Sequence, residues 1–267
     1  SLMDLIAPRV LCIGTHHKTG TLWMRTVFRK LAQALGIESH QVFAGSGDGM
    51  VPAADRVFLF QWSSAFPPVI LDRPDARILH VIRDPRDVLL SGMRYHRTAP
   101  AGGEEFLHIP RADLDGLTYQ QHLNALPHDS ARLMFEMGEK HAETLTAMTA
   151  WDYARDNTIE ARFEDLMQDH DTRGFSDHLR NLGLPEVEVA QGARIFWDSA
   201  LFGGLAAPEA RADRVKAHVT GGTGSGWRDA LPGDVAQAYA ARHGDALMTL
   251  GYETHPTNWL TEVRNAA

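Results

Sequence analysis

Short apolar runs alternate with longer stretches of helical periodicity along most of the chain. Three runs, 9–14, 56–62 and 76–82, consist mainly of aliphatic, β-branched and aromatic residues, and each predicts a buried strand. The more mixed segment 157–166 predicts a fourth. Near-continuous apolar strands are typical of parallel sheets, because both of their faces are covered. We therefore predict an α/β fold of the P-loop type, with three layers and a central parallel sheet flanked by helices, in which residues 10–14 form an inner strand.

Apolar residues recur at helical spacing between and after these runs. In 21–36, Val27, Leu31 and Leu35 fall near one face, and Gly36 is a natural C-terminal stop. A second helix is expected to start at Asp84 or Pro85, since proline is favoured in a first turn. Further helices are predicted over 130–155, 174–184 and 234–252.

The domain organisation follows from this alternation. The chain has 267 residues, which is enough for one large domain or two small ones. Because strands and helices alternate through most of it, we predict a single domain over 1–267. The least regular stretch, 98–130, is interpreted as an insertion or lid, and 219–227 as a glycine-rich loop.

Composition excludes several classes of protein. The net charge is −8, which argues against a nucleic-acid partner, since such a protein shows a basic face. The single cysteine, Cys12, excludes an internal disulfide framework. No apolar run approaches the roughly 18 residues of a membrane span, and no signal-peptide pattern opens the sequence. We therefore expect a cytoplasmic protein, and composition leaves its oligomeric state open, a homo-oligomer included.

The stretch "GTHHKTGTLW" joins the first predicted strand to the first predicted helix. Backbone N–H groups at a turn and at a helix N-terminus form a ready anion site. Lys18 adds a positive charge, Thr19 and Thr21 add hydroxyls, and Gly20 lets the backbone approach an oxyanion closely. In the common nucleotide loop the lysine follows the second glycine, whereas here it precedes Gly20 by two residues.

This loop resembles the 5′-phosphosulfate loop of sulfotransferases, which use 3′-phosphoadenosine 5′-phosphosulfate (PAPS) as donor. The family's pattern is P-K-[ST]-G-[ST]-[ST]-W, and "HKTGTLW" departs from it at His17 and Leu22. The resemblance implies that the loop binds PAPS through six residues: Lys18, Thr19, Gly20, Thr21, Leu22 and Trp23.

A second stretch, "VIRDPRDVLLSG", resembles the family's motif for the 3′-phosphate. Arg83 ends a predicted strand, and Ser91 follows it by eight residues. A guanidinium suits bidentate recognition of phosphate oxygens, and ligands of α/β sheets bind at the carboxyl ends of the strands. The resemblance implies that Arg83 and Ser91 hold the 3′-phosphate.

Two weaker similarities extend the resemblance to about residue 230. "ARFEDLMQD" places Phe163 where the family often has a tyrosine against the adenine, although an aromatic residue there is as readily part of the core. "GGTGSGWRDAL" resembles a late loop that closes over the nucleotide, to which Gly222 and Thr223 belong. Thr220 and Gly221 stand where the family has an Arg-Lys pair. Two upstream cations are candidates to compensate: Arg214 and Lys216.

The resemblance implies transfer of a sulfuryl group from PAPS to a hydroxyl or amine of a small-molecule or carbohydrate acceptor, with the bisphosphate PAP as product. A sulfuryl group carries less charge than a phosphoryl group, so no metal is expected. Lys18 is the catalytic candidate, because charge develops on the leaving phosphate beside it.

The acceptor also needs a base. Many members of the family have a histidine after the strand that corresponds to 56–62, whereas this chain has Gln-Trp-Ser there. His17 and Asp48 are the equal first candidates for this base. His16, beside the loop, and His96, near the end of the helix that follows Arg83, are further candidates.

Two other functions stay open on the sequence. A P-loop kinase-like phosphotransferase would need a Mg²⁺-binding acid, for which Asp84 is the candidate, but Lys18 lies on the wrong side of Gly20 for that class. A catalytically inactive module that binds PAP would explain the absent histidine and the absent Arg-Lys pair.

Overall fold

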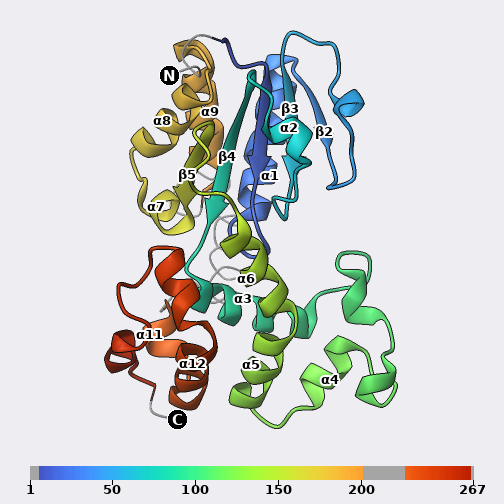
Figure 1. Cartoon of the computed structure of the whole chain (residues 1–267), viewed down its shortest axis with the longest axis vertical. Helices are drawn as coiled ribbons and strands as arrows, with labels where there is room; N and C mark the ends of the chain where they lie inside the picture. The colour runs from blue at the N-terminus through green and yellow to red at the C-terminus, as the bar shows by residue number, and fades with distance from the viewer. Residues whose placement is uncertain (1–5, 201–225, 266–267) are drawn as a thin grey trace. The chain divides into compact units, whose positions relative to one another are not determined.

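A computed structural model describes residues 6–200 and 226–265 (Figure 1). These residues form two compact units, one of 6–83 with 150–200, the other of 84–149 with 226–265. The expectation of a single domain stays a prediction.

The first unit is built on a sheet of five parallel strands in the order β2-β3-β1-β4-β5. The strands are β1 (Val10–Gly14), β2 (Glu38–Gln41), β3 (Val57–Gln61), β4 (Ala76–Ile82) and β5 (Thr158–Arg162). β1 lies between β3 and β4, so the predicted inner position of residues 10–14 is confirmed. The predicted α/β class with a central parallel sheet is confirmed as well.

Alternating residues of the central strands supply two apolar layers. Leu11 and Ile13 of β1 belong to a core that the helices on one face complete. Those helices are α1 (Thr21–Leu35), α7 (Phe163–Gln168), α8 (Arg173–Asn181) and α9 (Glu186–Ser199). Val10 and Cys12 belong to the core of the other face, where α2 (Pro68–Leu71) packs. The sheet is therefore covered on both faces, as its apolar strands require.

Two features of this unit differ from the sequence prediction. β2 was not predicted, because its residues "ESHQ" are polar and all exposed; it is an edge strand whose partner is β3. The strand predicted over 157–166 ends at Arg162, and Phe163 begins α7 instead. The short apolar pattern there is compatible with a strand or with a helix, so the local sequence does not fix the boundary between β5 and α7.

Every regular element among the described residues of the second unit is a helix. Its elements are α3 (Pro85–Thr98), η3 (Glu105–His108), η4 (Ala112–Leu114), α4 (Tyr119–Ala125), α5 (Asp129–Gly138), α6 (Lys140–Ala150), α11 (Gly226–Ala230), α12 (Gly233–Thr249) and η5 (Asn258–Glu262), where η marks a 3₁₀ helix. The helix predicted over 130–155 is two helices, separated at Glu139, whose backbone is non-helical (φ −114°, ψ −112°). Within 6–200 and 226–265, no helix combines the length and apolar character needed to cross a bilayer.

Candidate anion site in the first unit

The loop between β1 and α1 ends in an uncapped helix N-terminus. Gly20 is the N-cap residue of α1, with φ 99° and ψ 21°, and no side chain caps the helix. The first amides of a helix have no intrahelical partner and carry the positive end of its dipole. The start of α1 therefore presents donors of the kind that bind an anion.

The carbonyl oxygen of His16 organises the loop. It accepts a hydrogen bond from the Thr19 amide (3.1 Å), and the hydroxyls of Thr19 and Thr21 lie 2.9 and 3.0 Å from it. The Thr19 hydroxyl also faces the carbonyl of Val81 (3.2 Å) and is fully buried. Thr19 therefore shapes the loop through these contacts, and its predicted contact with the anion stays a prediction.

Lys18 occupies a left-handed backbone conformation, with φ 64°. Such a conformation costs a non-glycine residue free energy and is kept only where the surroundings hold it. Here Nη1 of Arg83 donates to the Lys18 carbonyl oxygen at 2.9 Å. The two stretches singled out in the sequence are thus joined directly, and Arg83 fixes the residue that carries the loop's charge.

Arg83 and Phe163 close one side of this loop. Arg83 follows β4 and is 5% exposed, and its guanidinium carbon lies 4.4 Å from the centre of the Phe163 ring. A Cβ on Gly20 would come within 3.0 Å of the same ring. The structure therefore brings Lys18, Gly20, Arg83 and Phe163 together within the first unit.

Gly20→Ala should lower the free energy of unfolding by about 1–3 kcal/mol and weaken anion binding, since it adds both backbone strain and a contact with Phe163. Gly36→Ala is the matched control. Gly36 also has a positive φ (65°), but nothing lies within 4 Å of its Cβ position. Chemical denaturation and PAP titration of both variants measure the two effects. Equal losses of stability with unchanged PAP affinity would contradict a binding role for the turn at Gly20.

The remaining loop residues divide into exposed and packed ones. Leu22 is 69% exposed, whereas Trp23 stacks on Phe196 with ring centroids 4.6 Å apart. The Thr21 hydroxyl lies 2.6 Å from that of Thr15. Trp23 thus anchors α1 on the core.

The other predicted nucleotide contacts fall outside the described part of the first unit. Ser91 is buried on α3, in the second unit. Gly222 and Thr223 lie outside the described residues, as do Thr220, Gly221 and the two candidate cations Arg214 and Lys216.

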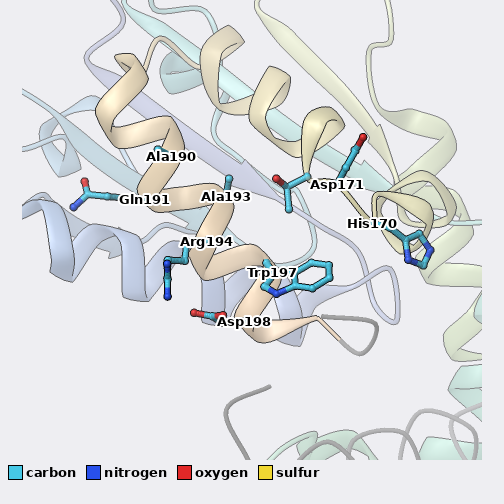
Figure 2. A pocket seen from close by; sticks show the side chains of 9 residues that line it. His170, Asp171, Ala190, Gln191, Ala193, Arg194, Trp197 and Asp198 are labelled. Atoms are coloured by element: carbon cyan, nitrogen blue, oxygen red, sulfur yellow. The ribbon is translucent and has the colours of Figure 1, made fainter. Parts of the chain in front are cut away.

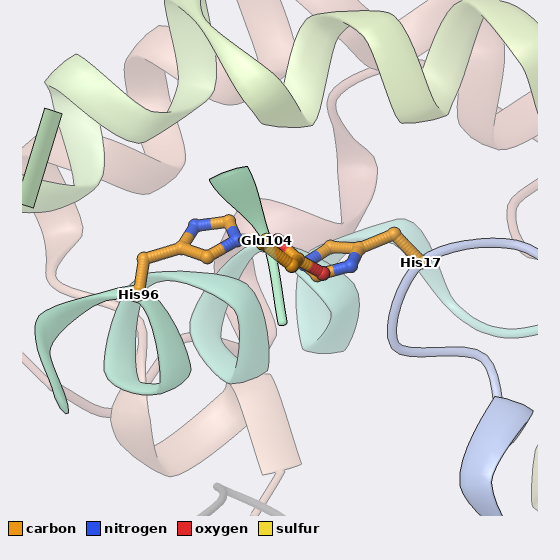
Figure 3. Close-up of side chains that lie close together, drawn as sticks. All are labelled: His17, His96 and Glu104. Atoms are coloured by element: carbon orange, nitrogen blue, oxygen red, sulfur yellow. Dashed lines mark hydrogen bonds and ion pairs between the residues drawn. The ribbon is translucent and has the colours of Figure 1, made fainter. Parts of the chain in front are cut away.

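Three of the candidate bases, His16, His17 and Asp48, lie in the first unit. Asp48 belongs to a short 3₁₀ helix, η2 (Asp48–Met50), and its Oδ1 pairs with Nη1 of Arg73 at 2.6 Å. This ion pair directs one carboxylate oxygen of Asp48 to Arg73. His17 is half-buried on the loop after β1 (Figure 3).

His96 is a buried residue of the second unit and lies between two carboxylates (Figure 3 shows Glu104). Its Nε2 is 3.2 Å from Glu104 and its Nδ1 is 2.7 Å from Glu136. Burial disfavours the charged ring, but the hydrogen bonds to and charges of the two glutamates outweigh burial and raise the pKa of His96. Both ring nitrogens of His96 thus face carboxylates, which weakens His96 as a candidate base.

A buried histidine pair, which sequence reasoning missed, lies beside the loop. Nε2 of His16 is 2.8 Å from Nε2 of His80, and Nδ1 of His80 is 2.7 Å from Glu160. Both rings are essentially unexposed. The signal in the sequence was His80 itself, the one titratable side chain inside the apolar run "ILHVI".

Asp84, the acid that a kinase would need, forms an ion pair with Arg86 within the second unit. Its two carboxylate oxygens accept hydrogen bonds from Nε and Nη2 of Arg86, at 2.9 and 2.8 Å. Arg86 is itself buried, pairs with Glu253 at 2.7 Å, and lies over the ring of Trp227. Asp84 therefore pairs with Arg86 and caps the N-terminus of α3. These contacts argue against a role for Asp84 as a Mg²⁺ ligand.

A separate pocket of about 740 Å³ opens on the α9 side of the first unit (Figure 2). Arg194, Trp197 and Asp198 of α9 line it, together with His170 and Asp171 from the turn before α8. Among the residues that the structure describes, none predicted to bind PAPS lines this pocket, so it is distinct from the loop site.

Comparison with known proteins gives remote structural similarities. No family model matches the sequence, and no curated protein matches it. Among solved structures, mouse sulfotransferase SULT7A1 complexed with PAP is similar at 15% identity and a TM-score of 0.40, over 77% of this chain and 69% of that chain. Retinol dehydratase in complex with androsterone and the inactive cofactor PAP is similar at 13% identity and a TM-score of 0.43, over 92% and 83%.

A second complex of retinol dehydratase, with retinol and PAP, matches at 14% identity and a TM-score of 0.35, over 71% of this chain and 64% of that one. These three similarities, all at TM-scores below 0.5, are too remote to assign a fold or an activity.

Proposed function

We propose that this protein is a PAPS-dependent sulfotransferase that moves a sulfuryl group to a hydroxyl or amine of a small-molecule or carbohydrate acceptor. The observation that supports this most directly is the contact between the two motifs: Arg83 donates to the carbonyl of Lys18, beside the uncapped start of α1. In this proposal the amides that begin α1 bind the 5′-phosphosulfate and Arg83 faces the 3′-phosphate. Ser91 is proposed as a further ligand of that phosphate.

Lys18 has the catalytic part in the proposal. The bond that breaks joins sulfur to a phosphate oxygen, so negative charge grows on that oxygen as the sulfuryl group departs. A cation and backbone donors that are already in place stabilise this charge without reorganising. The left-handed backbone of Lys18 and its tie to Arg83 supply that preorganisation.

PAP should raise the melting temperature of the protein more than ATP with Mg²⁺ does. A ligand that binds only the folded state stabilises it by RT ln(1 + [L]/Kd), about 2.7 kcal/mol at a hundredfold excess over Kd. Thermal-shift titrations with PAP and with ATP·Mg²⁺ measure the difference. Equal or reversed shifts would favour a kinase-like phosphotransferase, against which the pairing of Asp84 with Arg86 also argues.

An inactive PAP-binding protein is the second alternative, and it is separated by turnover. A PAPS-dependent screen of phenols, sugars, amines and lipid alcohols should yield at least one sulfated product. A PAP-induced shift without any product across that screen would support the binding module instead.

A further inference from the structure

A row of hydrogen-bonded side chains crosses the sheet and ends in the loop. The strand register places Gly14 beside His80, and His80 beside Glu160. His16 follows Gly14 by two residues and turns its ring back onto His80, with 2.8 Å between the two Nε2 atoms. The carboxylate of Glu160 completes the row, 2.7 Å from Nδ1 of His80.

Glu160 fixes the orientation of the His80 ring. One of its oxygens accepts from Nε1 of Trp151 at 2.9 Å, and the other faces Nδ1 of His80. The Trp151 ring stacks on the His80 ring with centroids 4.1 Å apart. A carboxylate only accepts hydrogen bonds, so Nδ1 of His80 carries a proton.

The proton on Nδ1 of His80 determines which nitrogen of His16 is left without a proton. With both rings neutral, Nε2 of His80 is an acceptor, and Nε2 of His16 must be the donor to it. Nδ1 of His16 is then an unprotonated acceptor. This atom is buried and has no hydrogen-bond partner among residues 6–200 and 226–265.

A buried acceptor without a donor is costly, by about 1–3 kcal/mol, so such an atom calls for an explanation. Burial, and then the neighbouring His80, lowers the pKa of His16 well below its usual value. The ring is therefore neutral at pH 7 and has a free lone pair. Gaining a proton there would require no rearrangement of the row.

We propose that His16, His80 and Glu160 form a proton relay in which Nδ1 of His16 takes the proton of the acceptor. The inference rests on the proposed sulfotransferase activity and names its base. As the acceptor's oxygen or nitrogen bonds to sulfur, the bond from sulfur to the phosphate oxygen breaks and PAP leaves with that electron pair. The acceptor's proton passes to Nδ1 of His16, and the proton on Nε2 of His16 passes to Nε2 of His80. The positive charge then lies on His80, beside the carboxylate of Glu160.

Other titratable groups near the row are consistent with this path. The Tyr153 ring lies 5.8 Å from that of His80. Burial and then the charge of Glu160 raise the pKa of Tyr153, so the phenol stays neutral. Arg162 lies on the same face of β5 as Glu160, two residues along the strand, and is the other charged residue on that face of β5.

His16→Gln tests the chemical role separately from the structural one. A glutamine amide can still donate to His80 but has no nitrogen that accepts a proton. Steady-state kinetics should show a kcat lower by about a hundredfold or more, with PAP affinity within about twofold of wild type. If glutamine restores wild-type kcat, His16 only supports the loop and the relay is wrong.

Glu160→Gln tests the far end of the relay. Removing the carboxylate lowers the proton affinity of the histidine pair, so kcat should fall and the acidic limb of its pH profile should move to lower pH by about one unit. Glu38→Gln is the matched control, because Glu38 pairs with His40 at 2.8 Å on the exposed edge strand β2. An unmoved pH profile in Glu160→Gln, or an equal shift in Glu38→Gln, overturns the proposal.

A spectroscopic readout separates this inference from the proposed function. Long-range ¹H–¹⁵N spectra of the full chain, assigned with the His16 and His80 variants, should show at pH 7 a proton on Nε2 of His16 and on Nδ1 of His80. A proton on Nδ1 of His16 would contradict the relay even if PAPS turnover were observed. The expected tautomers in a protein that binds no PAP would sink the proposed function while leaving the order of protons intact.

Discussion

Lys18→Ala should lower kcat by about a hundredfold or more while PAP affinity changes far less. An interaction that strengthens in the transition state lowers kcat when it is removed, whereas one that is equal in both states mainly raises KM. Charge develops on the leaving phosphate, and a preorganised donor at such a position contributes on the order of 10²–10³ in rate. The alanine also leaves the backbone contact to Arg83 in place, because that contact uses the Lys18 carbonyl.

Steady-state kinetics with any acceptor that turns over, together with PAP titration, give the two quantities for Lys18→Ala. Lys30→Ala is the control, since Lys30 is an exposed lysine of α1, the helix that follows the loop. A near-wild-type kcat in Lys18→Ala would show that "HHKTGTLW" is not a sulfuryl-transfer loop. An equal fall of kcat in Lys30→Ala would show that the effect comes from the loss of any positive charge near the loop, not from Lys18 in particular.

Arg83→Ala should chiefly weaken PAPS and PAP binding, by about 1.5–3 kcal/mol, or roughly 10- to 150-fold in Kd. The 3′-phosphate is remote from the transferred sulfur, so kcat should fall less than in Lys18→Ala. The sequence alone would predict an unchanged melting temperature without ligand, as for an exposed anion-site cation. The structure predicts a lower melting temperature for Arg83→Ala instead, because Arg83 is buried, donates to the Lys18 carbonyl and lies over Phe163.

Ligand-free melting curves and PAP titrations of Arg83→Ala measure both effects. Arg77→Ala is the matched control, because Arg77 lies at the opposite end of β4 and also donates to a backbone carbonyl, that of Asn181, at 2.7 Å. A lower melting temperature with unchanged PAP affinity would make Arg83 purely structural. A loss of PAP affinity in both variants would remove the case for a specific phosphate contact.

The sequence by itself determined the parts of the fold that depend on local pattern. Apolar runs such as 10–14, bounded by glycine and rich in aliphatic residues, favour buried strands in a covered sheet, and Gly36 ends α1 in the left-handed conformation that its position required. The strand–loop–helix at residues 10–35 was readable for the same reason. The proximity of Lys18 and Arg83 could be proposed, because both follow strands whose carboxyl ends share one edge of the sheet.

Tertiary structure alone decided how the polar side chains are used. The hydroxyl of Thr19, which is predicted to bind the anion, lies 2.9 Å from the carbonyl oxygen of His16, a contact that the sequence does not reveal. Asp48 and His96 had the right chemistry for a base, yet each has an ion-pair partner that the sequence does not reveal. The row from His16 to Glu160 depends on strand order and register, which set side chains 144 residues apart in sequence within hydrogen-bond reach of one ring, His80. Pairing across a sheet is a long-range property, so no local pattern encodes it.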